Sequence, residues 1–201
     1  NVDGLYWHSE LIKNNNKYHY DMRKQYEDNN LQIIQLRENE IYQKPDIIRS
    51  IINNKLNRNI TTIYARKCKV RKVDSKTAKD FLNKCHLKGN FKGKHFGLYY
   101  NNTLSAIITY KIYKNTILKV ERFCTELNTR VVGGFSKLLK YLENQVNFNE
   151  IHYWVDLKYG TGYFLLNLGF KHSHDTLGWE WTDFISTYNR RKCRANMDDR
   201  K

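Results

Sequence analysis

Two adjacent aromatic residues and a histidine, Tyr6, Trp7 and His8, stand near the start of the sequence. They end an apolar stretch that is typical of a β-strand, and such an aromatic pair suits a nuclease edge that wedges base pairs apart. Metal-dependent phosphodiester cleavage also needs carboxylates to hold the ion and a group that manages the attacking water. The alternative is that these three residues only pack one part of the chain onto the next, since buried aromatic residues mostly belong to a core.

Basic residues are in large excess. Lys and Arg number 35 against 20 Asp and Glu, which gives a formal net charge of +15. This excess favours a polyanionic partner, because each phosphate that a cation neutralises releases counterions. Charge runs are often only solvated surfaces, but the overall excess favours contacts with nucleic acid here. We expect those contacts from a strand-like segment, a loop and the C-terminal tail: Lys67, Lys69, Arg71, Lys72, Lys88, Lys92, Lys94, Arg190, Arg191, Lys192 and Arg194.

The four cysteines, Cys68, Cys85, Cys124 and Cys193, are far apart and form no Cys-x-x-Cys pair. This spacing is typical of unpaired thiols in a reducing compartment. Cys85 precedes a histidine, but no second pair completes a zinc site, so we expect no metal there. No apolar run approaches the roughly 20 residues of a membrane span, and no signal peptide is visible. We therefore expect neither a membrane partner nor secretion.

The first 58 residues predict a strand–helix–strand–helix order. Residues 2–8 and 31–36 have the patterns of strands, the second one buried. Residues 18–29 have the pattern of a helix, and Pro45 opens another helix through about Leu56.

This segment resembles the second half of a very-short-patch-repair-like nuclease of the PD-(D/E)XK type, as found in phage and homing endonucleases. The stretches GLYWHSE at 4–10 and LQIIQLRENE at 31–40 carry the resemblance. It implies that Tyr6 and Trp7 intercalate into DNA. It also implies that His8 and Asp3 act at the cleavage site of an active enzyme, with Mg²⁺ as its cofactor.

The sequence departs from that family at its acidic positions. Asn1 stands where the phage relatives carry a glutamate, and Asp3 stands where the repair enzymes have their first histidine. The metal-binding aspartate of the upstream strand has no counterpart. We therefore expect a catalytically silent descendant of such an enzyme.

From Thr61 onward the pattern changes. We predict a strand over 63–70, a helix capped by Asp74 or Ser75 through Lys84, and strands over 96–100, 104–113 and 117–125 with a turn at 101–102. A glycine pair then precedes a helix over 135–147. A strand over 151–155, a short helix over 163–168 and a last strand over 179–184 that closes the sheet complete the order.

This second order resembles an acyltransferase fold of the GNAT type, and more closely a GNAT-like domain found on phage endonuclease-like proteins. RVVGGFSKLL at 130–139 is its most specific stretch. The resemblance implies that Arg130, Gly133 and Gly134 present backbone amides to the pyrophosphate of coenzyme A. Phe135 replaces the small residue of that motif, and Leu165 replaces a tyrosine that commonly protonates the thiolate, so acetyl transfer is not favoured.

Together these patterns predict an α/β protein of mixed α+β type, with a GNAT-like mixed sheet flanked by helices. A truncated nuclease-like β-α-β-α segment precedes that sheet. The expected parts are a partial endonuclease-like segment at 1–58, a GNAT-like domain at 61–186 and a basic tail at 187–201.

The first functional hypothesis is a catalytically silent nucleic-acid-binding protein derived from a homing-type endonuclease. It would serve as a structural RNA-binding component of a ribonucleoprotein such as a mitochondrial ribosome, with RNA favoured over DNA, other proteins of that complex as partners, and no cofactor. The abundance of Asn, Lys, Ile and Tyr indicates an AT-rich genome, and the asparagine at position 1 indicates a processed chain. The expected location is therefore the mitochondrial matrix or a phage-infected cytoplasm.

Two alternatives stay open. The second hypothesis is an active homing-type or repair-like DNA endonuclease that needs Mg²⁺. The third is a GNAT-type acyltransferase that needs acetyl-coenzyme A.

Overall fold

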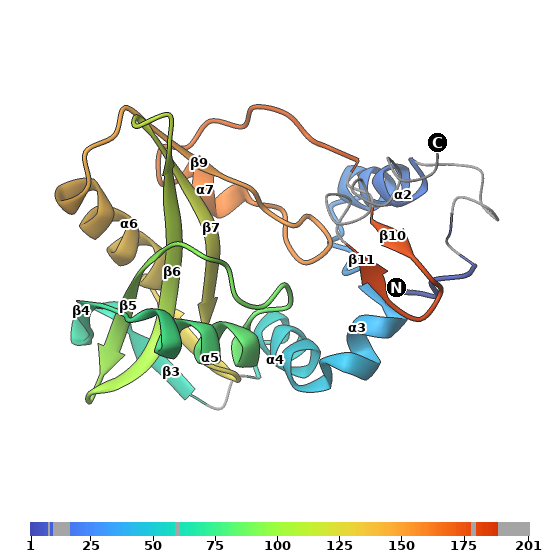
Figure 1. The fold of residues 1–201 in the computed structure, drawn as a ribbon. Coiled ribbons are helices and arrows are strands. Elements are labelled where there is room, and N and C mark those ends of the chain that lie inside the picture. The colour runs from blue at the N-terminus through green and yellow to red at the C-terminus, as the bar shows by residue number, and fades with distance from the viewer. Residues whose placement is uncertain (8, 10–16, 59–60, 178–179, 189–201) are drawn as a thin grey trace, which may run out of the picture. The chain divides into compact units, whose positions relative to one another are not determined.

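The structure, a computed structural model, describes residues 1–7, 9, 17–58, 61–177 and 180–188. It divides into two compact units, and Figure 1 labels helices and strands of both. Unit 1 comprises residues 1–43 and 155–201, and unit 2 comprises residues 44–154. Residues 155–186, expected in the GNAT-like part, thus group with the N-terminal segment. His8 and the tail cations from Arg190 onward lie outside the described residues.

Unit 2 is built on a five-stranded sheet with the order β4-β5-β6-β7-β9. Its strands are β4 (Lys69–Lys72), β5 (Lys94–Tyr100), β6 (Thr103–Tyr113), β7 (Ile117–Thr125) and β9 (Glu150–Tyr153). The first four pair antiparallel and β7 pairs with β9 in parallel, so the sheet is mixed. A separate parallel pair joins β3 (Thr61–Tyr64) to β8 (Thr129–Val132).

Helices cover both faces of the five-stranded sheet. Ile107 and Ile108 are neighbours on β6, so their side chains point to opposite faces, and both are fully buried. Ile107 belongs to the core around α5 (Ser75–Cys85), whereas α6 (Gly134–Gln145) packs through Tyr141 against Phe96 of β5. The expected fold class, a mixed sheet flanked by helices as in a GNAT-like fold, is confirmed.

Local chemistry explains several elements of unit 2. The Asp74 carboxylate accepts the backbone N–H groups of Lys76 and Thr77, so Asp74 is the predicted N-cap of α5. Asn101 and Asn102 have φ values of 48° and 63°, which two-residue hairpin turns require and asparagine tolerates. The predicted turn there and the predicted strand over 117–125 are confirmed.

The predicted strand over 63–70 is wrong. β3 ends at Tyr64, the turn η1 (Ala65–Lys67) follows, and β4 begins at Lys69. Ala65 and Cys68 are both buried and the Cys68 N–H donates to the Ala65 carbonyl, which is helical spacing inside a strand-like composition. Strand β8 was not predicted, because four residues of alternating burial before a glycine pair leave little pattern to recognise.

In unit 1, β1 (Val2–Asp3) pairs in parallel with β2 (Leu36–Arg37). Helices α2 (Tyr18–Asp28), α3 (Glu38–Gln43) and α7 (Tyr163–Leu166) and the hairpin β10 (Trp181–Thr182)–β11 (Thr187–Tyr188) complete the described elements. The helix predicted over 18–29 is confirmed, as is the Pro45 helix, α4 (Pro45–Lys55) of unit 2. None of the described helices is long and apolar enough to cross a membrane.

Three strand predictions for residues in unit 1 are wrong in extent or in partner. The strand predicted over 2–8 ends at Asp3, and the one predicted over 31–36 begins only at Leu36, with Leu31 exposed. The segment predicted to close the main sheet pairs instead with β11 in a hairpin of its own. The chain reverses there because the Asp183 side chain accepts two backbone N–H groups of the turn.

Candidate nucleic-acid interface

The two units differ in charge. Residues 44–154 hold 22 of the 35 lysines and arginines but only 7 of the 20 aspartates and glutamates. Unit 2 therefore carries the whole net charge of +15, and the charges of unit 1 sum to zero. A charge this concentrated attracts polyanions over the range of the Debye length, about 8 Å at physiological salt.

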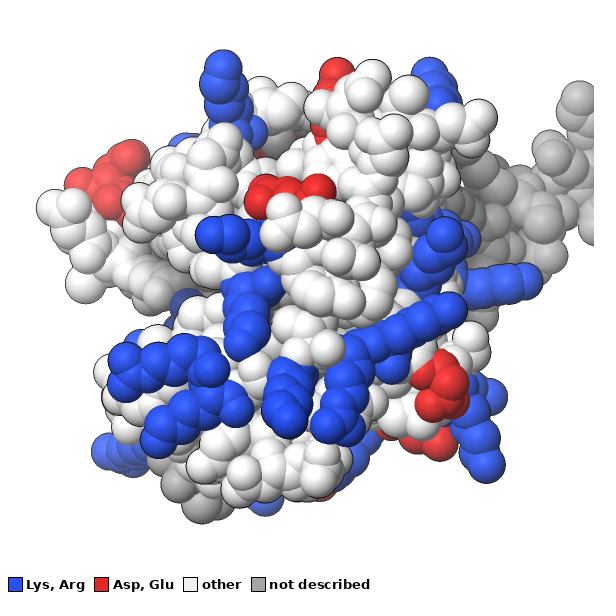
Figure 2. All heavy atoms as spheres, turned by 90° about the vertical axis from the view of Figure 1, so that its left-hand side faces the viewer, with Lys and Arg blue, Asp and Glu red and all other residues white. Residues whose placement is uncertain are grey.

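The first basic feature of unit 2 is the edge strand β4 with the turn before it. Five exposed cations occupy residues 66–72, and we call them the β4-edge cluster: Arg66, Lys67, Lys69, Arg71 and Lys72. In the described part of the chain, no ion pair joins any of the five to a carboxylate. Figure 2 turns the side of β4 and α6 toward the viewer and shows many Lys and Arg side chains there, with few Asp and Glu.

Two cations of the β4-edge cluster lie over aromatic rings. The Arg66 guanidinium lies 5.2 Å from the centre of the Tyr64 ring, and the Arg71 guanidinium lies 5.1 Å from that of Tyr99. Arg71 also donates to the Asn102 side chain at 2.9 Å. Charged side chains on an edge strand also prevent edge-to-edge pairing, so this cluster alone does not identify a ligand.

The second basic feature lies across three strands of the main sheet. Lys111 of β6 is directly opposite Lys119 of β7, and Lys119 is opposite His152 of β9, whose Nε2 lies 3.0 Å from the Glu150 carboxylate. Lys119 stands between the buried Leu118 and Val120, so its side chain leaves the opposite face of β7 from theirs. Like charges directly opposite on neighbouring strands are destabilising.

Aromatic rings complete this row. Phe91, from the loop after α5, has the Lys111 ammonium 4.9 Å and the Arg122 guanidinium 5.1 Å from its ring centre. The Lys119 ammonium lies 5.1 Å from the centre of the Tyr113 ring. Cations and aromatic rings side by side are the residue types that single-stranded nucleic-acid grooves combine. We call these six residues the sheet-face cluster: Phe91, Lys111, Tyr113, Lys119, Arg122 and His152.

The lowered pKa of His86 reflects in part the positive charges beside the sheet-face cluster. Burial and the nearby Arg122, Lys44 and Lys88 lower the pKa of His86 to about 3. The imidazole is therefore neutral at physiological pH, and its Nδ1 accepts the Lys88 backbone N–H at 3.1 Å. Burial also lowers the pKa of Arg122, whose guanidinium donates to the carbonyls of Gly89 and Glu121.

The structure brings together part of the predicted set. Lys67, Lys69, Arg71 and Lys72 adjoin one another, and Lys88, Lys92 and Lys94 are exposed in and beside the loop that carries Phe91. Lys111, Lys119, Arg122 and Phe91 were not predicted. The alternation within each strand shows only which residues share a face with Lys111 or with Lys119. The pairing of β6 with β7 is what shows that the two lysines are opposite each other.

The predicted site residues of unit 1 differ in their exposure to solvent. Tyr6 is 46% exposed and Trp7 66% exposed, so neither packs into a core. Asp3 is buried, its carboxylate 3.5 Å from His19 Nδ1 and hydrogen-bonded to the Asn1 side-chain amide. Its predicted catalytic partner, His8, is not described.

The acidic residues after β2 are also engaged within unit 1. Glu38 accepts the Leu5 backbone N–H at 2.6 Å. Glu40 is buried, and although burial alone would raise its pKa, the Lys158 ammonium at 2.9 Å and the Tyr159 hydroxyl lower it. Within the described residues, no group of three or more His, Cys, Asp or Glu side chains is arranged to hold a metal ion.

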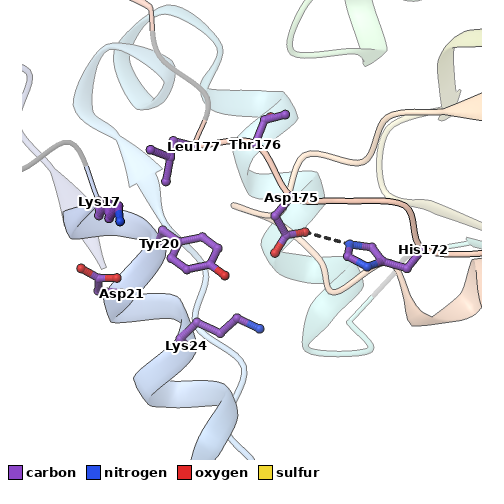
Figure 3. Close-up of a pocket in the computed structure, with 8 residues that line it drawn as sticks. All are labelled: Lys17, Tyr20, Asp21, Lys24, His172, Asp175, Thr176 and Leu177. Carbon is purple, nitrogen blue, oxygen red and sulfur yellow. Dashed lines mark hydrogen bonds and ion pairs between the residues drawn. The ribbon is translucent and has the colours of Figure 1, made fainter.

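Unit 1 also has an open pocket of about 510 Å³ between α2 and the segment 172–177 (Figure 3). Asp175 bonds His172 at 3.0 Å and Arg23 at 2.9 Å; burial would raise its pKa, but these two partners lower it. The ion pair between Arg23 and Asp175 ties the segment to α2. The lining residues include no predicted site residue: Lys17, Tyr20, Asp21, Lys24, His172, Asp175, Thr176 and Leu177.

The predicted coenzyme A turn has the backbone of a helix start. Gly133 has a φ of 73°, and a Cβ on Gly134 would lie 3.0 Å from a Val131 methyl group, so both glycines have structural reasons. The Phe135 ring contacts Phe123 and stacks on Tyr153, with centroid distances of 5.1 and 5.2 Å. Arg130 donates to the Asn57 side chain at 3.0 Å.

No protein-family model and no curated protein matches this chain. A solved structure described as a possible acetyltransferase from Clostridium difficile 630 is similar to part of it, with a TM-score of 0.41 and 17% sequence identity. That similarity covers 57% of this chain and 98% of the acetyltransferase-like chain. The nuclease resemblance of residues 1–58 stays a prediction.

Proposed function

We propose that this protein binds nucleic acid, with unit 2 as its phosphate-binding part. The observation that carries the proposal is the row formed by Lys111, Lys119 and His152, in which two lysines face each other directly. A folded protein gains nothing from that repulsion, whereas a phosphate backbone lying along the row relieves it. The location of the whole net charge in unit 2 supports the same conclusion.

The sheet-face cluster is the part of unit 2 best suited to bases as well as phosphates. Phe91 and Tyr113 each lie beside a lysine, so stacking and charge are offered within one row. The β4-edge cluster adds cations without carboxylate partners in the described chain. Backbone-tracking cations of this kind bind DNA and RNA alike, so sequence readout is not part of the proposal.

The test is the salt dependence of binding. Fluorescence anisotropy with labelled 20-nucleotide strands and duplexes, in DNA and in RNA, gives the slope of log affinity against log salt. We expect the double variant Lys111→Gln/Lys119→Gln to flatten that slope by about 1.4–1.8, at roughly 0.7–0.9 per lost phosphate contact. The triple variant Lys69→Gln/Arg71→Gln/Lys72→Gln should flatten it by about 2–3.

A matched control uses the exposed lysines of α5. Lys76→Gln/Lys79→Gln removes the same charge as the sheet-face double variant, from a helix outside both clusters. Its slope should equal that of the unchanged protein. Equal slopes for all three variants, or no binding of any probe at low salt, would refute the proposal.

We further propose RNA as the natural polyanion and a structural role in a ribonucleoprotein such as a mitochondrial ribosome. Its support is compositional. The protein should then copurify with RNA in a large particle, and recovery free of RNA would contradict this role. If DNA copurifies instead, and Mg²⁺-dependent nicking disappears in His8→Ala, the endonuclease alternative is favoured.

A second candidate function is coenzyme A binding at the start of α6. The left-handed Gly133 and the first-turn amides of α6 favour it, since those amides have no partner within the helix. Acetyl-coenzyme A at a thousandfold excess over its Kd should stabilise the folded protein by about 4 kcal/mol. A melting temperature unchanged across a wide concentration range would rule it out.

A further inference from the structure

Helix α5 ends in a tight turn of the chain from His86 to Gly89, which we call the His86 turn. The Gly89 N–H donates to the His86 carbonyl at 2.8 Å, and the Lys88 N–H donates to His86 Nδ1 at 3.1 Å. Gly89 has a φ of 62°, and a Cβ there would lie 2.9 Å from the Asn83 side-chain oxygen, so the turn requires glycine. The backbone of the turn and the Lys88 N–H together orient the His86 ring.

The tautomer of His86 follows from that orientation. Nδ1 accepts a hydrogen bond, so the proton of the neutral ring lies on Nε2, which is then a donor. Within the described residues, Nε2 has no hydrogen-bond acceptor. The half-buried ring thus presents one N–H donor that this part of the chain does not use.

Three cations converge on the same turn. The Lys44 ammonium, at the start of α4, donates to the Leu87 carbonyl, and Figure 1 shows α4 beside α5. The Arg122 guanidinium of β7 donates to the Gly89 carbonyl at 3.3 Å. The third cation is Lys88, which stands between these two carbonyls in the sequence and has an exposed side chain. Three different elements thus bring positive charge to one short turn.

The positive charge at the His86 ring is not offset by acids. Burial and the three cations lower the pKa of His86, and no acid among the described side chains counters them there. At Arg122, Glu121 raises the pKa, but burial outweighs it and the pKa is lowered. An anion at the turn would offset the burial of the Arg122 charge and would accept the Nε2–H of His86.

We propose that Lys44, His86, Lys88 and Arg122 form a binding site for a phosphate monoester, the group at a phosphorylated end of a nucleic-acid strand. We call it the end-phosphate site. The choice of a strand end as the source of the monoester rests on the proposed nucleic-acid binding. A phosphate monoester carries about −1.5 to −2 charges at pH 7 and three acceptor oxygens, whereas an internal phosphate carries one charge. Three cations and one neutral donor therefore match an end group better than an internal phosphate.

Arg122 connects the end-phosphate site to the sheet-face cluster. The Arg122 guanidinium and the Lys111 ammonium lie 5.1 and 4.9 Å from the centre of the same ring, that of Phe91. Lys119 is opposite Lys111 on the next strand. A nucleic-acid strand that ends at the His86 turn can therefore continue past Phe91 to the two lysines, and it would lie on the sheet in one direction only.

The affinity for different strand ends tests this inference in the full-length protein. Fluorescence anisotropy compares internally labelled 20-nucleotide strands, in DNA and in RNA, that carry a 5′-phosphate, a 3′-phosphate or hydroxyl groups at both ends. We expect one of the two phosphorylated strands to bind about tenfold more tightly than the hydroxyl strand, because hydrogen bonds to a charged group are the stronger kind.

Two variants remove groups of the end-phosphate site. Lys88→Gln removes an exposed cation, and His86→Asn keeps an acceptor for the Lys88 N–H but has no donor at the position of Nε2. Each should lose most of the preference for the phosphorylated end, and circular dichroism checks that each is folded. The matched control Lys79→Gln removes one exposed charge from α5, outside the site, and should keep the whole preference.

The ¹⁵N signal of His86 Nε2 locates the phosphate directly. The signal should shift with the phosphorylated strand and stay unchanged with the hydroxyl strand, and adenosine 5′-monophosphate tests a free monoester as the source. Equal affinity for all strand ends, or a preference that both variants retain, would overturn this inference and leave the proposed function intact. A shift with adenosine 5′-monophosphate, without binding of any strand, would support the site and overturn the proposed function. Neither strand binding nor a shift would overturn both.

Discussion

His86 is a residue whose protonation is coupled to folding. Its pKa is about 3 in the folded protein, owing to burial and to Arg122, Lys44 and Lys88, against an ordinary value of 6.5. Between these values the unfolded chain binds a proton that the folded chain does not. The stability that neutral His86 allows is therefore complete above pH 6.5 and is lost progressively as the pH falls toward 3.

We predict that His86→Gln makes the unfolding free energy less dependent on pH between 6 and 4. The unchanged protein should lose up to about 1.4 kcal/mol more per pH unit in that range than the variant does. Urea unfolding at half-unit intervals of pH measures the difference. Parallel curves for the two proteins would contradict the prediction.

For single residues, the sequence showed which side chains could do chemistry, but it did not show which neighbours they contact in the fold. Tyr6 and Trp7 are exposed and so do not pack into a core, and their contact with DNA stays a prediction. Asp3 was a sequence candidate for catalysis, yet its carboxylate is buried against Asn1 and His19. Phe91 gave no signal in the sequence, since only the folded loop brings it to Lys111 and Arg122.

At the scale of elements, strands β6 and β7 carry the lysine pair. Lys111 and Lys119 repel each other across the strands, and each is also attracted to a ring, Phe91 or Tyr113. Each effect is worth about 0.2–1 kcal/mol and they have opposite signs. The two lysines therefore add little net stability to the fold, and stability does not explain why both positions are lysine.

We predict that Lys111→Gln/Lys119→Gln changes the unfolding free energy by less than about 0.5 kcal/mol, as ordinary surface substitutions do. The same variant should weaken nucleic-acid binding. Chemical denaturation without ligand, beside the binding assay, separates the two effects. A loss of stability above about 1.5 kcal/mol would mean that the lysines act by packing, not by binding.

Elements whose own residues carry the full pattern of a turn or a strand were predicted from the sequence. Elements whose bounds depend on which strand they pair with were not. The Asn101–Asn102 turn and β7 combine turn chemistry with clear alternation. The boundary between β3 and β4 was hidden, because residues 63–70 have a strand-like composition that the chain uses in two different sheets. The hairpin after Trp181 was missed because Asp183 and Thr182 reverse the chain without glycine or proline.

At the scale of the whole molecule, the net charge lies in one of the two compact units, and the units do not simply follow the order of the chain. Unit 2 is a continuous segment with its own core, whereas unit 1 joins residues from both ends of the chain. The sequence predicted the net charge and a basic tail, but the restriction of that net charge to residues 44–154 emerged only once the compact units were known. A continuous segment that carries both a core and the charge should act alone.

We therefore predict that a fragment of residues 44–154 folds and keeps most of the salt-dependent binding of the full chain. Its log–log salt slope should match that of the full chain to within the roughly four contacts, at about 0.7–0.9 each, that the tail cations could add. The full-length variant Arg190→Ala/Arg191→Ala/Lys192→Ala/Arg194→Ala measures that tail share separately. A folded fragment, verified by circular dichroism, that has lost more slope than the tail variant would place the main phosphate contacts outside unit 2, because no change at 44–154 would then account for the loss.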